Sequence, residues 1–276
     1  MQVLNIPVPP GLLERWRGWL ALERQPFFLT GAEARALNLP TVPRAEAVLT
    51  PQERDTNTVW AVPAGADRVA WLTPAEWAAL PQRTQRDLLR LQVRHGRGNV
   101  PLGQHYADLL PGLQPGRFLW APGHLTPEVL ARVVGRGQAP CQRAEVPEGV
   151  WAQAQSVLPR ARELAGTFST GPGNCFGTVM GAAGVPNAEN EWMQREPFEA
   201  FLAKRSRPGG QDDRSGTLLV WRSERGREHA AVTLGGGWAL HKPAQTWWTP
   251  RVVRPVRDLI RDWRTPGQRL ARATLR

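Results

Sequence analysis

One cysteine and two histidines in the second half of the chain have the types and the order that thiol chemistry needs. Cys175 comes directly after the glycine-rich loop at 171–173 and begins a short apolar stretch. His229 and His241 lie on either side of a triple glycine, Gly235–Gly237. A thiol nucleophile works with an imidazole base and with a third group that orients the base. The three side chains therefore predict a nucleophile, a base and an orienting residue.

The residues around Cys175 predict a helix that begins at the cysteine. Apolar side chains recur after it at helical spacing, and Gly184 with Pro186 ends the run. Unpaired N–H groups and the helix dipole favour a negative charge in the first turn. We therefore expect the thiolate to be favoured at this position. The alternative is an inert core residue, because free cysteine is among the residue types most often buried.

The two histidines fall in a segment, 228–241, that predicts a β-hairpin. Apolar runs flank the three glycines, which supply the positive φ that tight turns require. A three-residue loop places Ala231 opposite His241 and points both imidazoles to one side. A two-residue loop would turn His241 to the other side. The catalytic interpretation therefore depends on the longer loop.

Three stretches of the second half resemble the NlpC-like cysteine peptidases, a family with a small papain-like fold. The stretches are Asn174-Cys175-Phe176-Gly177, Gly216-Thr217-Leu218-Leu219-Val220-Trp221, and His229-Ala230-Ala231-Val232-Thr233-Leu234-Gly235-Gly236-Gly237 with His241. The resemblance implies that Cys175 is the nucleophile, His229 the base and His241 the residue that orients it. It covers residues 150–276 and says nothing about the first 140.

The residues next to the predicted triad differ from the family pattern. Asn174 stands where the family has an aspartate that helps to hold a substrate amine, and Phe176 stands where a serine is common. This difference disfavours a stem peptide with a free amino group as the substrate. Asn174, Phe176 and Trp238 are the predicted substrate-binding residues.

Composition places limits on the class of protein. The chain has 276 residues, 41% of them hydrophobic, and a net charge of +11 that comes almost entirely from arginine. Neither a signal peptide nor a membrane span is predicted, and two cysteines without a Cys-x-x-Cys motif indicate a reducing cytoplasm. Zinc bound by Cys175, His229 and His241 is a further alternative, but zinc ligands usually come in closely spaced pairs. We expect no metal and no cofactor.

The first half predicts an N-terminal α/β domain over residues 1–140. Three Leu-Thr-Pro sequences, at 49–51, 72–74 and 125–127, predict helix starts with a threonine cap and a proline in the first turn. Short strands are expected at 68–71 and 117–120, before two of these starts, and a linker at 135–149.

Arginine-rich segments leave nucleic acid open as a partner. A basic amphipathic helix is predicted at 77–93, followed by a flexible loop at 95–99 that could contact phosphate. A solvated arginine face is the alternative. A helix is also predicted at 151–168, another at 196–204, and a last one at 256–263 that is followed by a basic tail.

The sequence as a whole predicts an α+β protein. Its C-terminal papain-like domain, 150–276, would carry the Cys175 helix packed on a small antiparallel sheet that bears the histidines. The favoured function is a thiol-dependent amide hydrolase or acyltransferase that acts on a peptide-like or acylated substrate recruited by the N-terminal domain. The alternative is an inactive papain-like fold that binds nucleic acid or protein through its basic surface.

Overall fold

The computed structural model describes residues 1–276 and divides them into two compact units. The N-terminal unit is 10–133, and the C-terminal unit joins 1–9 to 134–276. Eleven α-helices and three antiparallel sheets confirm the α+β class. The division falls before the linker expected at 135–149, and the first nine residues belong to the C-terminal unit. None of the helices combines the length and the apolar character needed to cross a bilayer.

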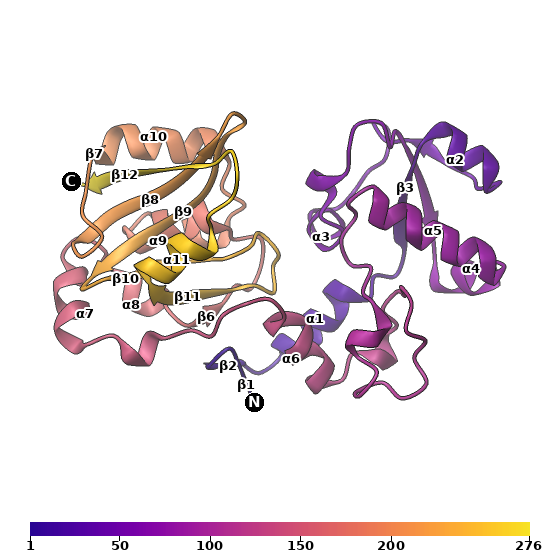
Figure 1. Cartoon of the computed structure of the whole chain (residues 1–276), viewed down its shortest axis with the longest axis horizontal. Helices are drawn as coiled ribbons and strands as arrows, with labels where there is room; N and C mark the ends of the chain where they lie inside the picture. The colour runs from indigo at the N-terminus through magenta and orange to yellow at the C-terminus, as the bar shows by residue number, and fades with distance from the viewer. The chain divides into compact units, whose positions relative to one another are not determined.

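The N-terminal unit is built around a three-stranded antiparallel sheet with helices packed on it (Figure 1). The strand order is β3-β5-β4. The strands are β3 (Gln25–Leu29), β4 (Val42–Pro43) and β5 (Arg68–Leu72). The helices are α1 (Leu12–Leu20), α2 (Gly31–Ala36), α3 (Pro51–Thr56), α4 (Pro74–Ala79), α5 (Gln82–Arg94) and α6 (Pro127–Gly135), the last of which runs across the boundary between the units.

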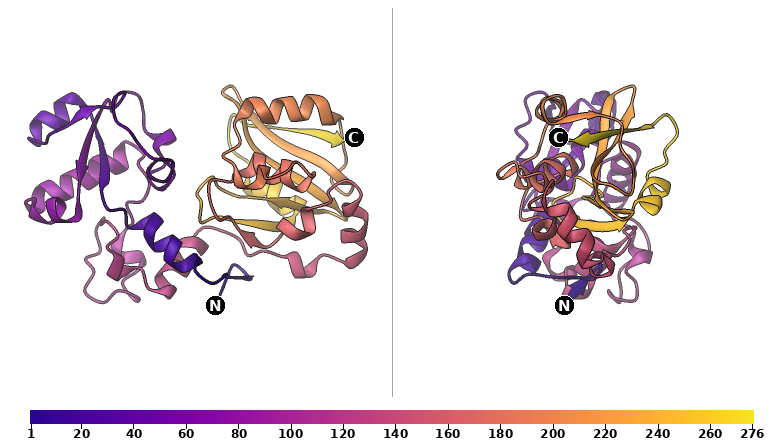
Figure 2. Two further views of the ribbon diagram at one scale, coloured as in Figure 1. Left: turned by 180° about the vertical axis from the view of Figure 1, so that it is seen from behind. Right: turned by 90° about the vertical axis from the view of Figure 1, so that its left-hand side faces the viewer.

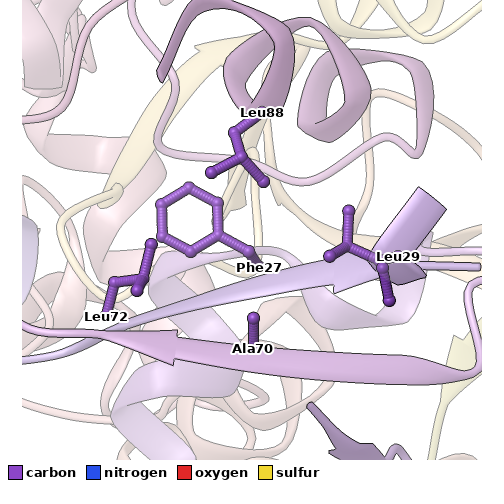
Figure 3. Packing of buried hydrophobic residues seen from close by; sticks show 6 residues of the cluster. Phe27, Leu29, Ala70, Leu72 and Leu88 are labelled. Carbon is purple, nitrogen blue, oxygen red and sulfur yellow. The ribbon is translucent and has the colours of Figure 1, made fainter. Parts of the chain in front are cut away.

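The core of this unit lies between β3, β5 and α5 (Figure 3). Alternate residues of each strand point to the helix, Phe27 and Leu29 from β3 and Ala70 and Leu72 from β5, where they meet Leu88. Burial of each large apolar side chain contributes about 1.5–3 kcal/mol. The amphipathic pattern of α5 therefore packs the helix on the sheet and leaves its arginines outside.

The threonine-proline sequences begin helices as predicted. Thr50 and Thr73 each accept a hydrogen bond from the N–H of the glutamate three residues later, and that glutamate bonds back to the threonine N–H. α6 begins at the third such sequence. The prediction of a strand at 117–120 is wrong, because only one isolated bridge, between Leu102 and Arg117, forms there. The helix predicted at 77–93 is two helices, α4 and α5, with Pro81 between them.

The C-terminal unit is built on a seven-stranded antiparallel sheet in the order β6-β11-β10-β9-β8-β12-β7. Its strands are β6 (Thr167–Phe168), β7 (Ser206–Pro208), β8 (Ser215–Ser223), β9 (Gly226–Gly235), β10 (Trp238–His241), β11 (Pro250–Pro255) and β12 (Arg269–Leu275). Its helices are α7 (Glu148–Gln155), α8 (Ala161–Leu164), α9 (Cys175–Ala182), α10 (Arg195–Arg205) and α11 (Val256–Asp262), with 3₁₀ turns η4 (Arg143–Glu145) and η5 (Ala188–Asn190).

Helices cover both faces of this sheet. α9 lies against one face and α11 against the other (Figures 1 and 2). The α11 face is apolar because alternate residues of three strands point to it and pack on Val256 and Leu259: Leu219, Trp221, Ala231 and Ala239. A two-stranded hairpin, β1 (Gln2–Val3) with β2 (Ile6–Pro7), completes the unit.

Two segments of the C-terminal unit differ from the sequence prediction. The helix expected at 151–168 is broken into α7 and α8 and ends in β6, since Pro159 lies in its middle and cannot continue the backbone hydrogen bonds. The basic tail is strand β12, which pairs with β8 through 269–274 and with β7 through 273–275. Apolar residues alternate along this segment, but the arginines between them made it resemble a basic tail.

Candidate active site

The hairpin that carries the histidines has a two-residue turn, yet it keeps the predicted register. Trp238 pairs with Gly235, so Gly236 and Gly237 alone form the turn, both with positive φ. A β-bulge between Trp238 and Ala239 then shifts the pairing, and Leu240 lies opposite Val232. One further step places His241 at the level of Ala231, as the three-residue loop would have done. The predicted loop length is wrong, and the bulge compensates for the difference.

The two imidazoles are hydrogen-bonded to each other. Nε2 of His229 lies 3.2 Å from Nδ1 of His241, and both side chains are almost fully buried, at 2% and 3% exposure. The indole of Trp263, directly after α11, stacks on the His229 ring with centroids 3.7 Å apart and an angle of 2° between the planes. His229 is therefore fixed by a hydrogen bond along its ring edge and by an aromatic ring on its face.

Cys175 occupies the first turn of α9, as the sequence predicts. Asn174 caps this helix, because its side-chain oxygen accepts the N–H of Gly177. The backbone around the cysteine packs tightly on η5. A Cβ at Gly173 would lie 1.9 Å from the carbonyl oxygen of Glu189, and one at Gly177 would lie 2.2 Å from that of Ala188. Glycine is required at both positions, and the start of α9 is rigidly placed.

The Cys175 thiol reaches the strand that carries His229. The backbone N–H of Ala230 donates a hydrogen bond to its sulfur. Ala230 follows His229 directly, and β9 pairs with β10 only as far as Val232 opposite Leu240. The thiol and both imidazoles therefore lie at the end of the β9–β10 pair. The two imidazoles share the α11 face of the sheet with Trp221 and Trp263, whereas α9 carries the thiol on the other face. The structure therefore brings His229 and His241 together but does not place Cys175 on their side of the sheet.

Burial controls the protonation of this site. It raises the pKa of the Cys175 thiol to about 11, although the N–H of Ala230 and the charge of Lys242 act in the opposite direction. Burial, and then the charge of Arg254, lower the pKa of His241 to about 3. Burial, and then His241, hold the pKa of His229 well below its usual range. The thiol and both imidazoles are therefore neutral at rest, which contradicts the expectation that the helix start favours a thiolate.

Comparison of the chain with models of protein families, with curated proteins and with solved structures finds no match. The chemistry of these side chains is therefore what bears on the function of the site.

Two of the three predicted substrate-binding residues have structural roles instead. Asn174 uses its side-chain oxygen on Gly177, and its amide donates to the carbonyl oxygen of Met193 at 2.8 Å. Phe176 is buried and stacks on Phe198 with ring centroids 4.3 Å apart. Both side chains fix α9 to its neighbours and have no face left for a substrate.

The third of these residues, Trp238, lies away from the thiol. It stands at the first position of β10, beside the turn, while His241 stands at the last. Three residues of extended strand separate them by about 10 Å. Trp238 instead lines a cavity with the turn glycines and the first residues of α11. The structure does not bring Trp238 to the predicted site.

Three groups of the site were not predicted from the sequence. They are Trp263, the backbone N–H of Ala230, and Lys242, which is fully buried next to His241. Trp263 was expected only as an apolar residue of the last helix. A backbone N–H carries no sequence signal. Lys242 had one signal, because it is one of only two lysines among 35 basic residues.

The His241 ring also borders a cavity of about 260 Å³ on the α11 side of the sheet. Trp263, Arg254 and Asp262 line the same cavity, and the last two form an ion pair at 3.2 Å. The side chains in the structure form no cluster of three metal-binding groups. His229 and His241 bond to each other through nitrogens that a shared zinc ion would otherwise occupy.

Proposed function

We propose that the C-terminal unit is a papain-like, NlpC-type thiol hydrolase or acyltransferase for amide or ester substrates. The observation that carries this proposal is the hydrogen bond between His229 and His241 beside the Ala230 N–H that holds the Cys175 sulfur. The base and its orienting partner meet on the α11 face, and the nucleophile contacts the backbone of the same strand, β9, from the α9 face. Nucleophilic catalysis by a thiol requires a base in reach of the sulfur, directly or through one water molecule, and the proposal takes the second route.

The neutral resting state sets the order of steps. A water molecule at the edge of β9 passes the proton of the Cys175 sulfur to Nδ1 of His229 as the sulfur attacks the substrate carbonyl carbon and forms the C–S bond. The resulting imidazolium is oriented by His241. It then gives the proton to the leaving amine or alcohol, whose bond to the carbonyl carbon breaks and leaves a thioester. Water or an acceptor amine attacks the thioester in the second half-reaction, its proton returns through His229, and the thiol is released.

The first turn of α9 supplies the stabilisation of the oxyanion in this mechanism. Its backbone N–H groups lack intrahelical partners, and Asn174 satisfies the one of Gly177. The remaining N–H groups and the positive end of the helix face the cysteine. An oxyanion-hole donor typically contributes about 3–4 kcal/mol to the lowering of the barrier.

The proposal also covers the role of the N-terminal unit and the cellular compartment. We assign to the N-terminal unit the recruitment of a peptide-like or acylated substrate. The absence of a disulfide, with Cys141 and Cys175 both free, fits a reducing cytoplasm.

An acylation experiment tests the proposed function. The protein is mixed with p-nitrophenyl acetate, and release of p-nitrophenol and the intact mass are followed together. We expect a burst of about one equivalent and an acetyl adduct on the peptide that contains Cys175, with neither in His229→Ala. Cys141→Ser serves as the background, since Cys141 is buried in hydrogen-bond contact with the N–H of Val253. An adduct that forms equally without His229 contradicts the proposal.

A second candidate function is supported by the burial of the thiol. Cys175 is only 6% exposed, which fits an inactive fold that binds a partner through a basic surface. On α5, Arg83, Arg90 and Arg94 have side-chain exposures of 90%, 74% and 71%. The predicted loop at 95–99 does not add to this surface, because Arg97 is buried and donates to Gln25. Salt-sensitive binding of nucleic acid that persists in Cys175→Ala would support this candidate.

A further inference from the structure

Lys242 is a buried cation beside the proposed triad. It follows His241 directly and has no exposed surface. The only other lysine, Lys204, is exposed on α10. Lysine is almost never fully buried unless its charge is engaged, because removal of an ammonium group from water costs several kcal/mol.

The ammonium group is bound by the loop that follows β10. Nζ of Lys242 donates to the carbonyl oxygens of Ala244 at 2.9 Å, Gln245 at 3.4 Å and Thr246 at 2.6 Å. An ammonium group has three N–H donors, and three carbonyl groups match them. Carbonyl groups satisfy these donors but carry no net charge. The hydrogen bonds therefore hold the loop in place.

The charge of Lys242 acts on the Cys175 sulfur. It lowers the pKa of the thiol, as does the N–H of Ala230, against the larger effect of burial. His241 points to the α11 face, so Lys242, the next residue, points to the opposite face, where α9 packs on β9 and β10. A positive charge near a buried thiol stabilises the thiolate that forms as the proton leaves.

Other charged groups lie at both ends of α9: Arg251 of β11 donates at 2.6 Å to the carbonyl oxygen of Glu189 that packs on Gly173, and the rest face the far end. The helix itself has no charged residue. From η5, Glu189 lies beside Gly181 and pairs with Arg160 at 2.7 Å. From α10, Arg205 donates to the carbonyl oxygen of Ala183, beyond the last turn. On β9 and β10, His229 and His241 are neutral, since burial lowers the pKa of each.

We propose that Lys242 is a positioning residue of the active site, whose ammonium group fixes the loop at 243–246 and provides the positive charge that stabilises the Cys175 thiolate. The proposal rests on the proposed function, since it concerns the same thiol. It adds a fourth side chain to the predicted three and gives a reason for a buried lysine in a chain with only one other lysine.

The test is the rate of Cys175 alkylation by iodoacetamide as a function of pH in four proteins. They are the Cys141→Ser background and the same background with Lys242→Met, Lys242→Arg or Lys204→Met. Between pH 7 and 9.5 the rate rises with the thiolate fraction. We expect Lys242→Met to displace the profile to higher pH by about one unit, so the rate at a given pH falls about tenfold. Lys242→Arg should recover most of the rate, and Lys204→Met should match the background.

A second measurement separates charge from loop anchoring. Because the chain has two lysines, ¹⁵Nζ-labelled lysine gives two resolvable NMR signals in the intact protein. We expect the Lys242 ammonium signal to be slow in hydrogen exchange, because its N–H groups are buried and hydrogen-bonded, and that of exposed Lys204 to exchange rapidly. A profile unchanged in Lys242→Met, with only a lower unfolding temperature, overturns the proposal and leaves Lys242 as a loop anchor.

The outcomes also separate this proposal from the proposed function. If Cys175 depends on His229 but is indifferent to Lys242, the catalytic account stands and the inference fails. If Cys175 is inert in every folded variant, both fail together. If Lys242→Met and Lys242→Arg are equally slow, charge is not the cause and the inference fails.

Discussion

At the scale of single residues, the site combines identities that are readable in the sequence with an environment that is not. The spacing of His229 and His241 predicted that their rings meet, but the sequence did not show that Cys175 lies on the opposite face of the sheet. Their burial reverses the expected charge, because desolvation outweighs the helix start at Cys175 and raises the pKa of the thiol. Sequence alone cannot predict such a balance, since burial depends on segments as distant as Trp263.

The buried histidines predict an acid-sensitive fold. The pKa of His241 in the folded protein, about 3, lies below the value of about 6.5 in an unfolded chain. Between these values the unfolded chain binds the additional proton. The contribution of neutral His241 to the free energy of unfolding is therefore fully present above about pH 6.5 and is lost as the pH falls toward 3. Each such histidine contributes a slope of about 1.4 kcal/mol per pH unit.

Replacement of one histidine tests this linkage. His241→Gln keeps a hydrogen-bonding side chain next to His229 but cannot titrate. We expect a shallower fall in the free energy of unfolding between pH 6.5 and 4.5, measured by urea denaturation at several pH values. The slope is independent of any constant loss of stability in the variant. Parallel curves for the two proteins would show that His241 does not remain neutral in the folded state.

At the scale of elements, the sequence predicted helix starts and the hairpin turn, but it did not predict the bulge in the hairpin or the last strand. Threonine caps predicted helices α3, α4 and α6, and the triple glycine predicted the β9–β10 hairpin. The loop length was wrong because a bulge can replace a loop residue without a change in register. Strand β12 was predicted as a basic tail because its sequence is rich in arginine. Its place in the sheet depends on pairing with β7 and β8, which the local sequence does not indicate.

The close packing of α9 on η5 predicts the effect of a methyl group. Propensity alone would make Gly177→Ala stabilising by up to about 1 kcal/mol, because alanine favours helix. The added Cβ would instead lie 2.2 Å from a backbone carbonyl oxygen that cannot move aside easily. We expect a loss of about 1–3 kcal/mol in the free energy of unfolding and a lower rate of Cys175 alkylation.

A nearby glycine provides the matched control for that substitution. A Cβ at Gly171, in the loop before the cysteine, would meet no atom within 4 Å. Gly171→Ala should therefore leave stability within about 0.5 kcal/mol of the unmodified protein. Equal stabilities for the two variants would contradict the packing of η5 against the start of α9.

At the scale of the whole molecule, the first nine residues belong to the C-terminal unit, together with residues 134–276. The N–H of Cys141 donates to the carbonyl oxygen of Leu4 at 2.9 Å, and the N–H of Val253 donates to the sulfur of Cys141 at 3.3 Å. The sequence predicted a boundary after residue 140 but not this association. Short strands such as β1 and β2 have too few residues to show a pattern, and nothing local indicates their partner.

Removal of the first nine residues should therefore affect the distant end of the chain. Val3 and Ile6 are buried, so the deletion exposes apolar surface of the C-terminal unit. We expect faster amide hydrogen exchange in β11, where Val253 is linked to Cys141, and unchanged exchange in β3 and β5. Faster exchange in the N-terminal unit instead would mean that the division of the chain into units is wrong.

The most direct measurement of the central claim is the rate at which iodoacetamide alkylates Cys175 at pH 7, with and without His229. It needs no knowledge of the substrate, and Cys141→Ser provides the background. If His229 takes the thiol proton, the rate in His229→Ala falls by at least about tenfold while the fold is retained, since general bases contribute about 10²–10⁴-fold. If the two rates are equal, or if Cys175 reacts only after unfolding, the site is not a thiol hydrolase.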